Sequence, residues 1–345
     1  MAKIFKKPAT VIFLIILGLA IGSSLRFLND FFYRSISSHS LANVSPLINV
    51  ELAKKELNSE LTKKEPPEIN LVFVGDIMLD RGVRQKIEKV GNNDFRFPFL
   101  KIAPFLNQSD LVAGNLEGPL SDKGKKVGNF YSFRMSPQSL DGLTFTNFKV
   151  LFLANNHSGD WGEEALKDTV LNLRNVGILP VGADIDLEKA YSPKILEIKG
   201  VKFAFLAFSD FFVPGVALAK EEKIKSAIKK AQSLADLVIV AFHFGTEYLK
   251  EPNARQKLLA QLAIDNGADL VIGSHPHVIE PLETYHQRYI AYSLGNFVFD
   301  QKFSKDTMTG GLLKVILKGK RISQATLYEV RLNNDFQPEL ENEND

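Results

Sequence analysis

The sequence predicts an α/β protein built on a mixed sheet or on a pair of packed sheets. Up to His277, short apolar runs rich in β-branched and aromatic residues alternate with stretches whose apolar residues recur at three- and four-residue spacing. This pattern is typical of alternating strands and helices. After His277, strand-like runs follow one another with little helix between them, which favours antiparallel pairing late in the chain.

The individual strands and helices follow from these patterns in chain order. Buried strands are expected in six runs: LVFVGD ending at Asp76, DLVAGNLE ending at Glu117, KVLFLANNH ending at His157, KFAFLAFSD over 202–210, DLVIVAFHFG over 236–245 and DLVIGSHPH over 269–277. Helices are expected over 163–176, 221–234 and 254–266. Later strands are expected in YIAYSLGNFVF, GLLKVIL and RISQATLYEV, with His286 in a hairpin turn.

The first residues predict a membrane anchor. Lys3, Lys6 and Lys7 precede a run from Pro8 to Leu25 that contains no charge, and at about 1.5 Å per residue this run spans roughly 27 Å, close to the hydrocarbon thickness of a bilayer. A cleaved signal peptide is the alternative, but no clean A-x-A site closes the run. The lysines favour a cytoplasmic amino terminus. We therefore expect a single-pass protein of the cell membrane whose main domain is extracytoplasmic.

Composition divides the chain into four segments and excludes some functions. The expected segments are the cytoplasmic lysines and transmembrane anchor at 1–34, a flexible linker at 35–68, one folded domain at 69–332 and an acidic disordered tail at 333–345. The formal charge is only +2, so no field favours a nucleic acid, and we expect no such partner. The chain has no cysteine, which excludes disulfides, thiolate metal sites and cysteine nucleophiles.

Polar side chains follow the apolar strands at the points where the strands end. They are Asp76, Glu117, Asn155, Asn156, His157, His243, His275 and His277, and they include four of the six histidines of the chain. In open α/β sheets the carboxyl ends of strands form the ligand crevice, so we expect these side chains to converge. Imidazoles, carboxylates and an amide without thiolate suit a divalent metal such as Mn, Zn or Fe. These are more candidate ligands than one tetrahedral ion needs, which favours two ions.

An ordered set of motifs then carries a family resemblance. GDIML (75–79), GNLEGPL (114–120), LANNHSGDWG (153–162), FHFGTEY (242–248), GSHPHV (273–278) and YSLGNFVFDQ (292–301) resemble the CapA family of poly-γ-glutamate capsule proteins, which is related to the calcineurin-like metallophosphoesterases. The resemblance spans 69–300 in the right order. It implies a four-layer αββα sandwich with two mixed sheets flanked by helices.

The resemblance also implies roles for the residues at the strand ends. Asp76 and His277 would ligate the first metal, and Glu117 would bridge the two ions. Asn156, His243 and His275 would ligate the second metal. His157 would be the general acid that protonates a leaving oxygen.

The sequence departs from the superfamily pattern at three positions. Met78 stands where a histidine is usual, which puts the first metal in doubt. The bridging residue is Glu117 where an aspartate is usual, and Phe244 follows His243 where many members have a tryptophan. The first two departures put ordinary phosphodiesterase activity in doubt.

Three other polar residues are candidates for substrate binding, namely Arg81, Asn155 and Asn296. Arg81 would either clamp a phosphate or a carboxylate with its fork of donors or be a solvated residue at the start of a helix. Glu247 and Tyr248 are expected to line the same pocket as His243.

Asp160 has two possible roles. It would either orient His157 or cap the helix that follows it. Of these, we expect the cap.

Two classes of function follow from these observations. The first is a membrane-anchored CapA-like protein of poly-γ-glutamate capsule or cell-surface polymer synthesis, with a metal-dependent hydrolase site that acts on a phosphoester or on the anionic polymer. The alternative is a non-catalytic subunit that binds or exports the polymer within a capsule assembly complex. The family resemblance implies membrane-bound synthesis and export subunits as partners in either case.

Overall fold

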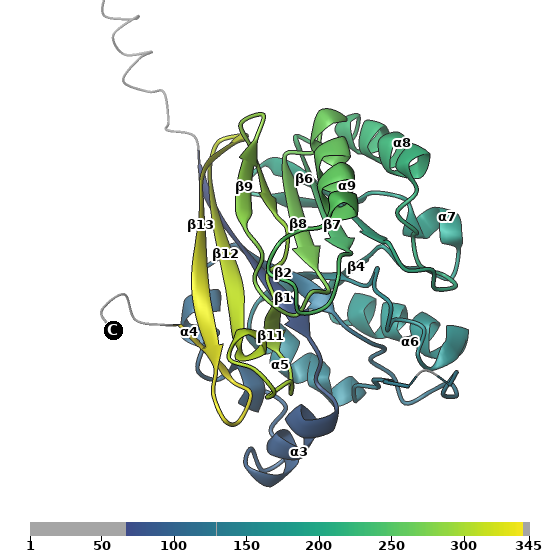
Figure 1. The fold of residues 1–345 in the computed structure, drawn as a ribbon, viewed down its shortest axis with the longest axis vertical. Coiled ribbons are helices and arrows are strands. Elements are labelled where there is room, and N and C mark those ends of the chain that lie inside the picture. Colours follow the sequence, from purple (N-terminus) through teal and green to yellow (C-terminus); the bar gives the residue numbers. More distant parts are fainter. Residues whose placement is uncertain (1–66, 129, 341–345) are drawn as a thin grey trace, which may run out of the picture. The chain divides into compact units, whose positions relative to one another are not determined.

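The computed structural model describes residues 67–128 and 130–340 (Figure 1). The predicted anchor at 1–34 and nearly all of the predicted linker at 35–68 lie outside these residues. Among the residues that are described, no helix is both long enough and apolar enough to cross a bilayer.

Strands and helices alternate as the sequence predicts. The strands are β1 (Glu68–Ile77), β2 (Leu111–Leu116), β3 (Phe148–Phe152), β4 (Leu179–Val181), β5 (Lys194–Ile198), β6 (Val201–Ser209), β7 (Leu237–His243), β8 (Leu270–Ser274), β9 (Leu282–Tyr285), β10 (Arg288–Ala291), β11 (Asn296–Val298), β12 (Thr309–Lys318), β13 (Arg321–Leu332) and β14 (Pro338–Leu340). The helices are α3 (Arg81–Lys89), α4 (Ala103–Leu106), α5 (Leu140–Phe145), α6 (Gly162–Asn175), α7 (Leu187–Ala190), α8 (Glu221–Gln232) and α9 (Ala254–Asp265).

The strands form two mixed sheets. The eight-stranded sheet has the order β14-β13-β12-β1-β2-β3-β4, with β11 pairing with β1, and the six-stranded sheet has the order β5-β6-β7-β8-β10-β9. Pairing is parallel from β1 to β4 and from β6 through β8 to β10, and it is antiparallel at β12, β13 and β14. The prediction of mixed sheets with late antiparallel pairing is therefore confirmed.

Side-chain alternation along the six-stranded sheet separates two cores. In β6, Phe203 and Phe205 join the core that lies between the two sheets, whereas Leu206 and Phe208 pack against α8 and α9 on the outer face. These two helices lie side by side over β6, β7 and β8 (Figure 1). Because successive strand residues point to opposite faces, the same alternation in β7 places His243 on the inner face, in line with Ile239.

The chain after β13 differs from the prediction of a disordered tail beginning at Asn333. Pro338–Leu340 form β14, which pairs with β13 in the register Val330↔Leu340. Asn333 organises the connecting turn, because its Oδ1 accepts from the backbone of Asp335 and Gln337. The folded domain therefore extends at least to Leu340. The strand is too short and polar to give a clear sequence signal.

A close backbone approach beside β1 leads to a stability prediction. A Cβ at Gly75 would lie 1.9 Å from the carbonyl oxygen of Gly295, which belongs to the segment leading into β11. Gly75→Ala should lower the free energy of unfolding by about 3 kcal/mol or prevent folding, because backbone cannot move aside as a side chain can. Urea unfolding measures the loss.

Gly177→Ala is the matched control. Gly177 has φ +77° and nothing within 4 Å of an added Cβ, so the substitution should cost only about 1 kcal/mol, from backbone conformation alone. An equal loss in the two variants would contradict the steric explanation.

Candidate metal centre and adjoining pocket

The carboxyl ends of parallel strands from both sheets meet at one place. β1, β2 and β3 lead to Asp76, Glu117 and Asn156, while β7 and β8 lead to His243 and to the two histidines beyond Ser274. Side chains and backbone from the two sheets are in contact here. The backbone N–H of His275 lies 3.4 Å from Asp76 Oδ2, and His243 Nε2 lies 2.8 Å from Asn156 Oδ1.

The first cluster consists of Asp76, Glu117 and His277. One ligand atom from each of these buried residues lies within 4.8 Å of the others. His277 Nδ1 lies 3.2 Å from Asp76 Oδ2, and His277 Nε2 lies 3.6 Å from Glu117 Oε1. Two carboxylates and an imidazole are ligands that divalent metals accept, so this cluster could hold an ion.

Asn115 is a site residue that the sequence prediction missed. Its Nδ2 donates to Asp76 Oδ1 at 2.7 Å and lies 3.3 Å from Glu117 Oε2, and its Oδ1 accepts from Asn155 Nδ2 at 3.0 Å. Asn155 is fully buried and also donates to the carbonyl of Leu116 at 2.8 Å. The available signal was spacing, because Asn115 lies two residues before Glu117 and therefore on the same face of the strand.

Asn296 fixes the orientation of His277. Its Nδ2 donates to Gln301 Oε1 at 3.0 Å and to the carbonyl of Thr307 at 2.9 Å, so its Oδ1 is the atom that accepts from His277 Nδ1 at 3.0 Å. The ring therefore carries a proton on Nδ1 and directs Nε2 toward Glu117. Metal-binding histidines commonly have such a second hydrogen bond.

The second cluster consists of Asn156, His243 and His275. The hydroxyl of Ser274 donates to the carbonyl of Phe242 at 3.3 Å, so it accepts from His243 Nδ1 at 2.9 Å. The lone pair of a neutral His243 is then on Nε2, and it faces the amide oxygen of Asn156. The rings of His243 and His275 lie 4.8 Å apart between centroids.

Two buried atoms at the site lack hydrogen-bond partners within the described structure. They are Glu117 Oε1 and His275 Nδ1. Buried polar groups are almost always paired, and both atoms are electron-pair donors of the kind that ligate cations. His275 and His277 also have positive φ angles of +102° and +59°, a conformation that costs free energy in a non-glycine residue. The residues present therefore fit a divalent cation.

Burial and charge set the protonation of the site. Burial together with the charge of Asp76 raises the pKa of Glu117 well above its ordinary value. Burial and the neighbouring imidazoles lower the pKa of His243 well below its ordinary value and that of His275 to about 3. Burial disfavours the charged form of His277, but Glu117 and Asp76 outweigh it and raise its pKa to about 9. His243 and His275 are thus neutral, the form that binds metals.

Asp160 orients His157 and does not cap a helix, contrary to the prediction. Asp160 Oδ2 lies 2.8 Å from His157 Nδ1 and accepts from the backbone of Phe133 at 2.9 Å. Helix α6 has Trp161 at its N-cap position, without a side-chain cap. His157 Nε2 is left facing Glu117, with 3.9 Å between Nε2 and Oε1.

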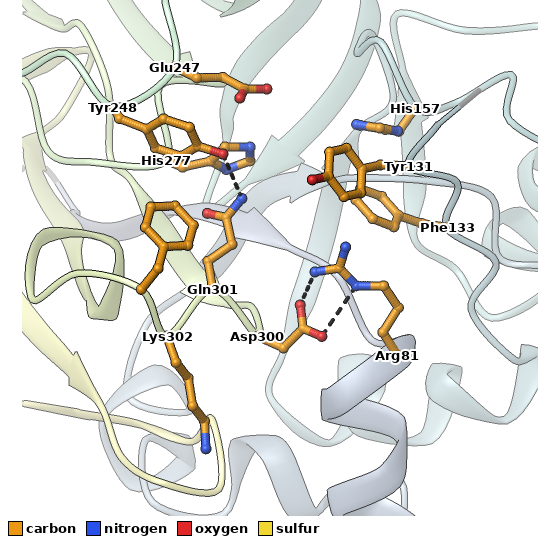
Figure 2. Close-up of a pocket in the computed structure, with 11 residues that line it drawn as sticks. Arg81, Tyr131, Phe133, His157, Glu247, Tyr248, His277, Asp300, Gln301 and Lys302 are labelled. Atoms are coloured by element: carbon orange, nitrogen blue, oxygen red, sulfur yellow. Dashed lines mark hydrogen bonds and ion pairs between the residues drawn. The ribbon is translucent and has the colours of Figure 1, made fainter.

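A pocket of about 270 Å³ opens beside His157 and His277. Figure 2 shows its walls, which are formed by Arg81, Tyr131, Phe133, His157, Glu247, Tyr248, His277, Asp300, Gln301, Lys302 and Phe303. Glu247 and Tyr248 line it, but His243, with which they were expected to share a pocket, is not among its lining residues. Arg81 also lines it, whereas Asn155 and Asn296 are fully buried and use their side chains within the protein. Their placement therefore gives no support to the prediction that these two residues bind substrate.

Comparison with known proteins finds that the chain is similar to bacterial capsule synthesis proteins. A family model described as "Bacterial capsule synthesis protein PGA_cap" matches residues 70–301. "Capsule biosynthesis protein CapA" of Bacillus anthracis is 33% identical over 288 residues, covering 77% of this chain and 69% of that relative. "PGA biosynthesis protein CapA" of Bacillus subtilis (strain 168) is 37% identical over 258 residues, covering 71% and 67%.

Solved structures share the fold at low sequence identity. A phosphatase from Mycoplasma pneumoniae matches with a TM-score of 0.51 and 14% identity, covering 77% of this chain and 94% of that chain. A hypothetical protein from Thermus thermophilus matches with a TM-score of 0.50 and 15% identity, covering 76% and 98%. The likeness supports a mixed α/β sandwich of the kind found in a phosphatase.

A buried carboxyl group lies against the start of helix α9. Glu280 is 1% exposed, its Oε2 accepts from Gln256 Nε2 at 2.6 Å, and its Oε1 is unpaired within the described residues. Gln256 also closes a capping box with Asn253 at the start of α9. Burial, opposed by the hydrogen bond from Gln256, raises the pKa of Glu280 from 4.5 to about 7.

This raised pKa predicts a pH dependence of stability. The folded state retains the Glu280 proton to a higher pH than the unfolded chain, so the wild type should lose stability as pH rises from 4.5 to about 7. Glu280→Gln keeps an acceptor for Gln256 and cannot ionise. It should lose less stability than the wild type between about pH 5 and pH 8, by on the order of 1 kcal/mol.

Urea unfolding of both proteins at the two pH values measures the difference. Glu164→Gln, which removes an exposed carboxylate from the first turn of α6, is the control and should follow the wild type over this range. Identical pH dependence in Glu280→Gln and the wild type would contradict the assignment.

Proposed function

Since the chain belongs to the PGA_cap family of bacterial capsule synthesis proteins, we propose that it is a membrane-anchored protein of poly-γ-glutamate or cell-surface polymer synthesis with a metal-dependent hydrolase site. The family match confirms the resemblance seen in the sequence motifs. The observation that carries the proposed site is the buried cluster of Asp76, Glu117 and His277, whose ligand atoms lie within 4.8 Å of one another.

Two divalent ions, Mn, Zn or Fe, would be held by the two clusters. Asp76 and His277 would hold the first ion, and Asn156, His243 and His275 would hold the second. Glu117, with one unpaired buried oxygen within the described residues, would bridge them. When bound, the ions supply Lewis acidity and charge for the hydrolysis of a phosphoester or an amide.

His157 would be the general acid of that hydrolysis. It lines the pocket, and its Nδ1 is held by Asp160 at 2.8 Å, so Nε2 is the ring atom left to transfer a proton. The carboxylate of Asp160 stabilises the ring when both nitrogens are protonated. The proton would pass from Nε2 to the leaving oxygen of the substrate.

We also propose that the protein has a membrane anchor and works with membrane-bound partners. The charge-free run from Pro8 to Leu25 and the lysines before it support a single-pass anchor with the domain outside the cytoplasm. The names of the Bacillus relatives, which refer to capsule and PGA biosynthesis, support the anionic polymer as a ligand. Membrane-bound synthesis and export subunits would be the protein partners.

A non-catalytic polymer-binding or export subunit is the second candidate, and Met78 favours it. Met78 stands where related metallophosphoesterases usually have a histidine ligand, and it is fully buried with its Sδ 3.2 Å from the backbone nitrogen of Asp80. The first cluster therefore lacks one nitrogen ligand. An ion bound there would be held by fewer protein groups.

Metal content separates the two candidates. Full-length protein purified without chelator and supplied with Mn²⁺ or Zn²⁺ should contain about two ions per chain, as measured by elemental mass spectrometry. His277→Ala and His275→Ala should each lower the content by about one ion, because each removes a ligand from a different cluster.

His286→Ala is the control for these variants. His286 lies in the β9–β10 hairpin turn with its side chain 70% exposed, so its replacement should leave the metal content unchanged. Absence of bound metal from the wild type would reject the hydrolase and favour the polymer-binding subunit. An unchanged content in His275→Ala would reject the second cluster.

Replacement of His157 tests catalysis separately from metal binding. His157→Gln should keep the wild-type metal content and lower kcat by about 100-fold or more, because it removes the proton donor. Asp160→Asn should lower kcat less, since it disturbs only the orientation of the ring. Turnover of phosphodiesters and of poly-γ-glutamate measures the effect, and wild-type turnover in His157→Gln would reject its role as the acid.

A further inference from the structure

The pocket beside the metal cluster has one wall that carries an ion pair. Arg81, the first residue of α3, meets Asp300, which follows β11. The Nε of Arg81 donates to Asp300 Oδ2 at 3.2 Å, and Nη2 donates to Asp300 Oδ1. Asp300 Oδ2 also accepts from the backbone of Gly82 at 2.9 Å, so the carboxylate is itself held at the start of the helix.

We infer that Arg81 binds an oxyanion of the ligand, a carboxylate or a phosphate, and that Asp300 positions it for this purpose. The inference rests on the proposed function, because it assigns a ligand contact within the same pocket. Asp300 uses the edge of the guanidinium formed by Nε and Nη2. The remaining nitrogen, Nη1, points away from Asp300 toward the cavity between Tyr131 and Gln301 (Figure 2).

Aromatic packing fixes the guanidinium relative to the imidazoles of His157 and His277. The Arg81 guanidinium carbon lies 4.9 Å from the ring centroid of Phe133 and 5.8 Å from that of Phe299. The ring centroids of Phe133 and His157 lie 4.2 Å apart, and those of Phe299 and His277 lie 4.9 Å apart. An anion bound by Arg81 would therefore have a defined position with respect to both histidines.

The backbone of Arg81 is held in an unfavourable conformation. Its φ is +50°, in the left-handed region that non-glycine residues seldom adopt. Such strain persists only where the surroundings enforce it, and it is concentrated at functional sites. From this conformation the side chain makes its two bonds to Asp300 and its two aromatic contacts.

Lys302, which also lines the pocket, directs its amino group away from the cavity. Its Nζ donates to the carbonyl of Asn334 at 3.1 Å and lies 4.4 Å from the ring centroid of Phe336. Figure 2 shows the chain of Lys302 leading away from the cavity. Among the described residues that line the pocket, Arg81 is thus the one with a permanent positive charge directed into it.

The chemistry of the guanidinium specifies the ligand group. Its planar N–H donors match the oxygens of carboxylates and phosphates, and it remains charged at any physiological pH. Because Asp300 already uses one edge, the ligand would receive bonds from Nη1 and from the outward hydrogen of Nη2. Carboxylate and phosphate groups share this requirement, and only binding measurements with each anion separate them.

Isothermal titration of full-length protein in Mn²⁺ with inorganic phosphate and with a γ-linked glutamate tetramer tests the inference. Arg81→Gln should weaken binding of at least one of these anions by about tenfold or more. Arg81→Lys should show a smaller loss, because lysine keeps the charge without the fixed donor geometry. Loss with phosphate alone identifies a phosphoester subsite, and loss with the tetramer alone identifies a carboxylate subsite.

Two variants serve as controls. Arg84→Gln makes the same substitution one turn along α3, where Arg84 pairs with Glu88 on the surface. Lys302→Gln removes an amino group that points away from the cavity. Both should bind the anions within about twofold of the wild type. A loss in Lys302→Gln equal to that in Arg81→Gln would overturn the inference in favour of general electrostatic attraction.

Separate titration with Mn²⁺ distinguishes failure of this inference from failure of the proposed function. Arg81→Gln should retain the wild-type affinity for Mn²⁺, since Arg81 belongs to neither metal cluster. Unchanged anion affinity in Arg81→Gln, or no measurable binding of either anion by the wild type, would overturn the anion contact. If the wild type binds no Mn²⁺, the metal proposal fails, and the same anion titrations without metal still decide the role of Arg81.

Discussion

The burial of two carboxylates between the two sheets is the constraint on which the rest of the site depends. Asp76 and Glu117 are both fully buried, and an isolated buried carboxylate is strongly unfavourable. Asn115 donates hydrogen bonds to both groups, and the two ring nitrogens of His277 lie between them. One oxygen of Glu117 still lacks a partner in the described structure, which is why a cation suits this place.

The polar residues around these groups use their hydrogen bonds to hold the groups in place. Side-chain amides link three parallel strands, from Asp76 on β1 through Asn115 on β2 to Asn155 after β3. Asn296 extends the support to His277, and Ser274 gives the same support to His243. Since each of these partners fixes a ring or a carboxylate in one orientation, the donor atoms are positioned before any ion arrives.

Much of the fold and the convergence of the site could be predicted because both depend on local patterns. The two-residue period of β7 places His243 on the inner face, and the run of parallel strands brings Asp76 and Glu117 to one edge. The contacts between distant residues could not be predicted. The bond from Asn115 to Asp76 depends on the register of two neighbouring strands, which short-range spacing does not encode. For Asp160 the sequence allowed two roles, and the structure shows the role that was not preferred, with the carboxylate between His157 and the backbone of Phe133.

The sequence by itself determined the element order, the family, and which residue types gather at the strand ends. Only the tertiary structure decided how those residues pair. Arg81 and Asp300 are 219 positions apart, and His275 and Asp76 are 199 apart, so no periodicity along the chain relates them. Arg81 meets Asp300 because β11 pairs with β1 within the eight-stranded sheet, whereas His275 meets Asp76 because the two sheets pack face to face. Pairing and packing of that kind follow from the shapes and hydrogen-bonding groups of the whole core rather than from any one segment.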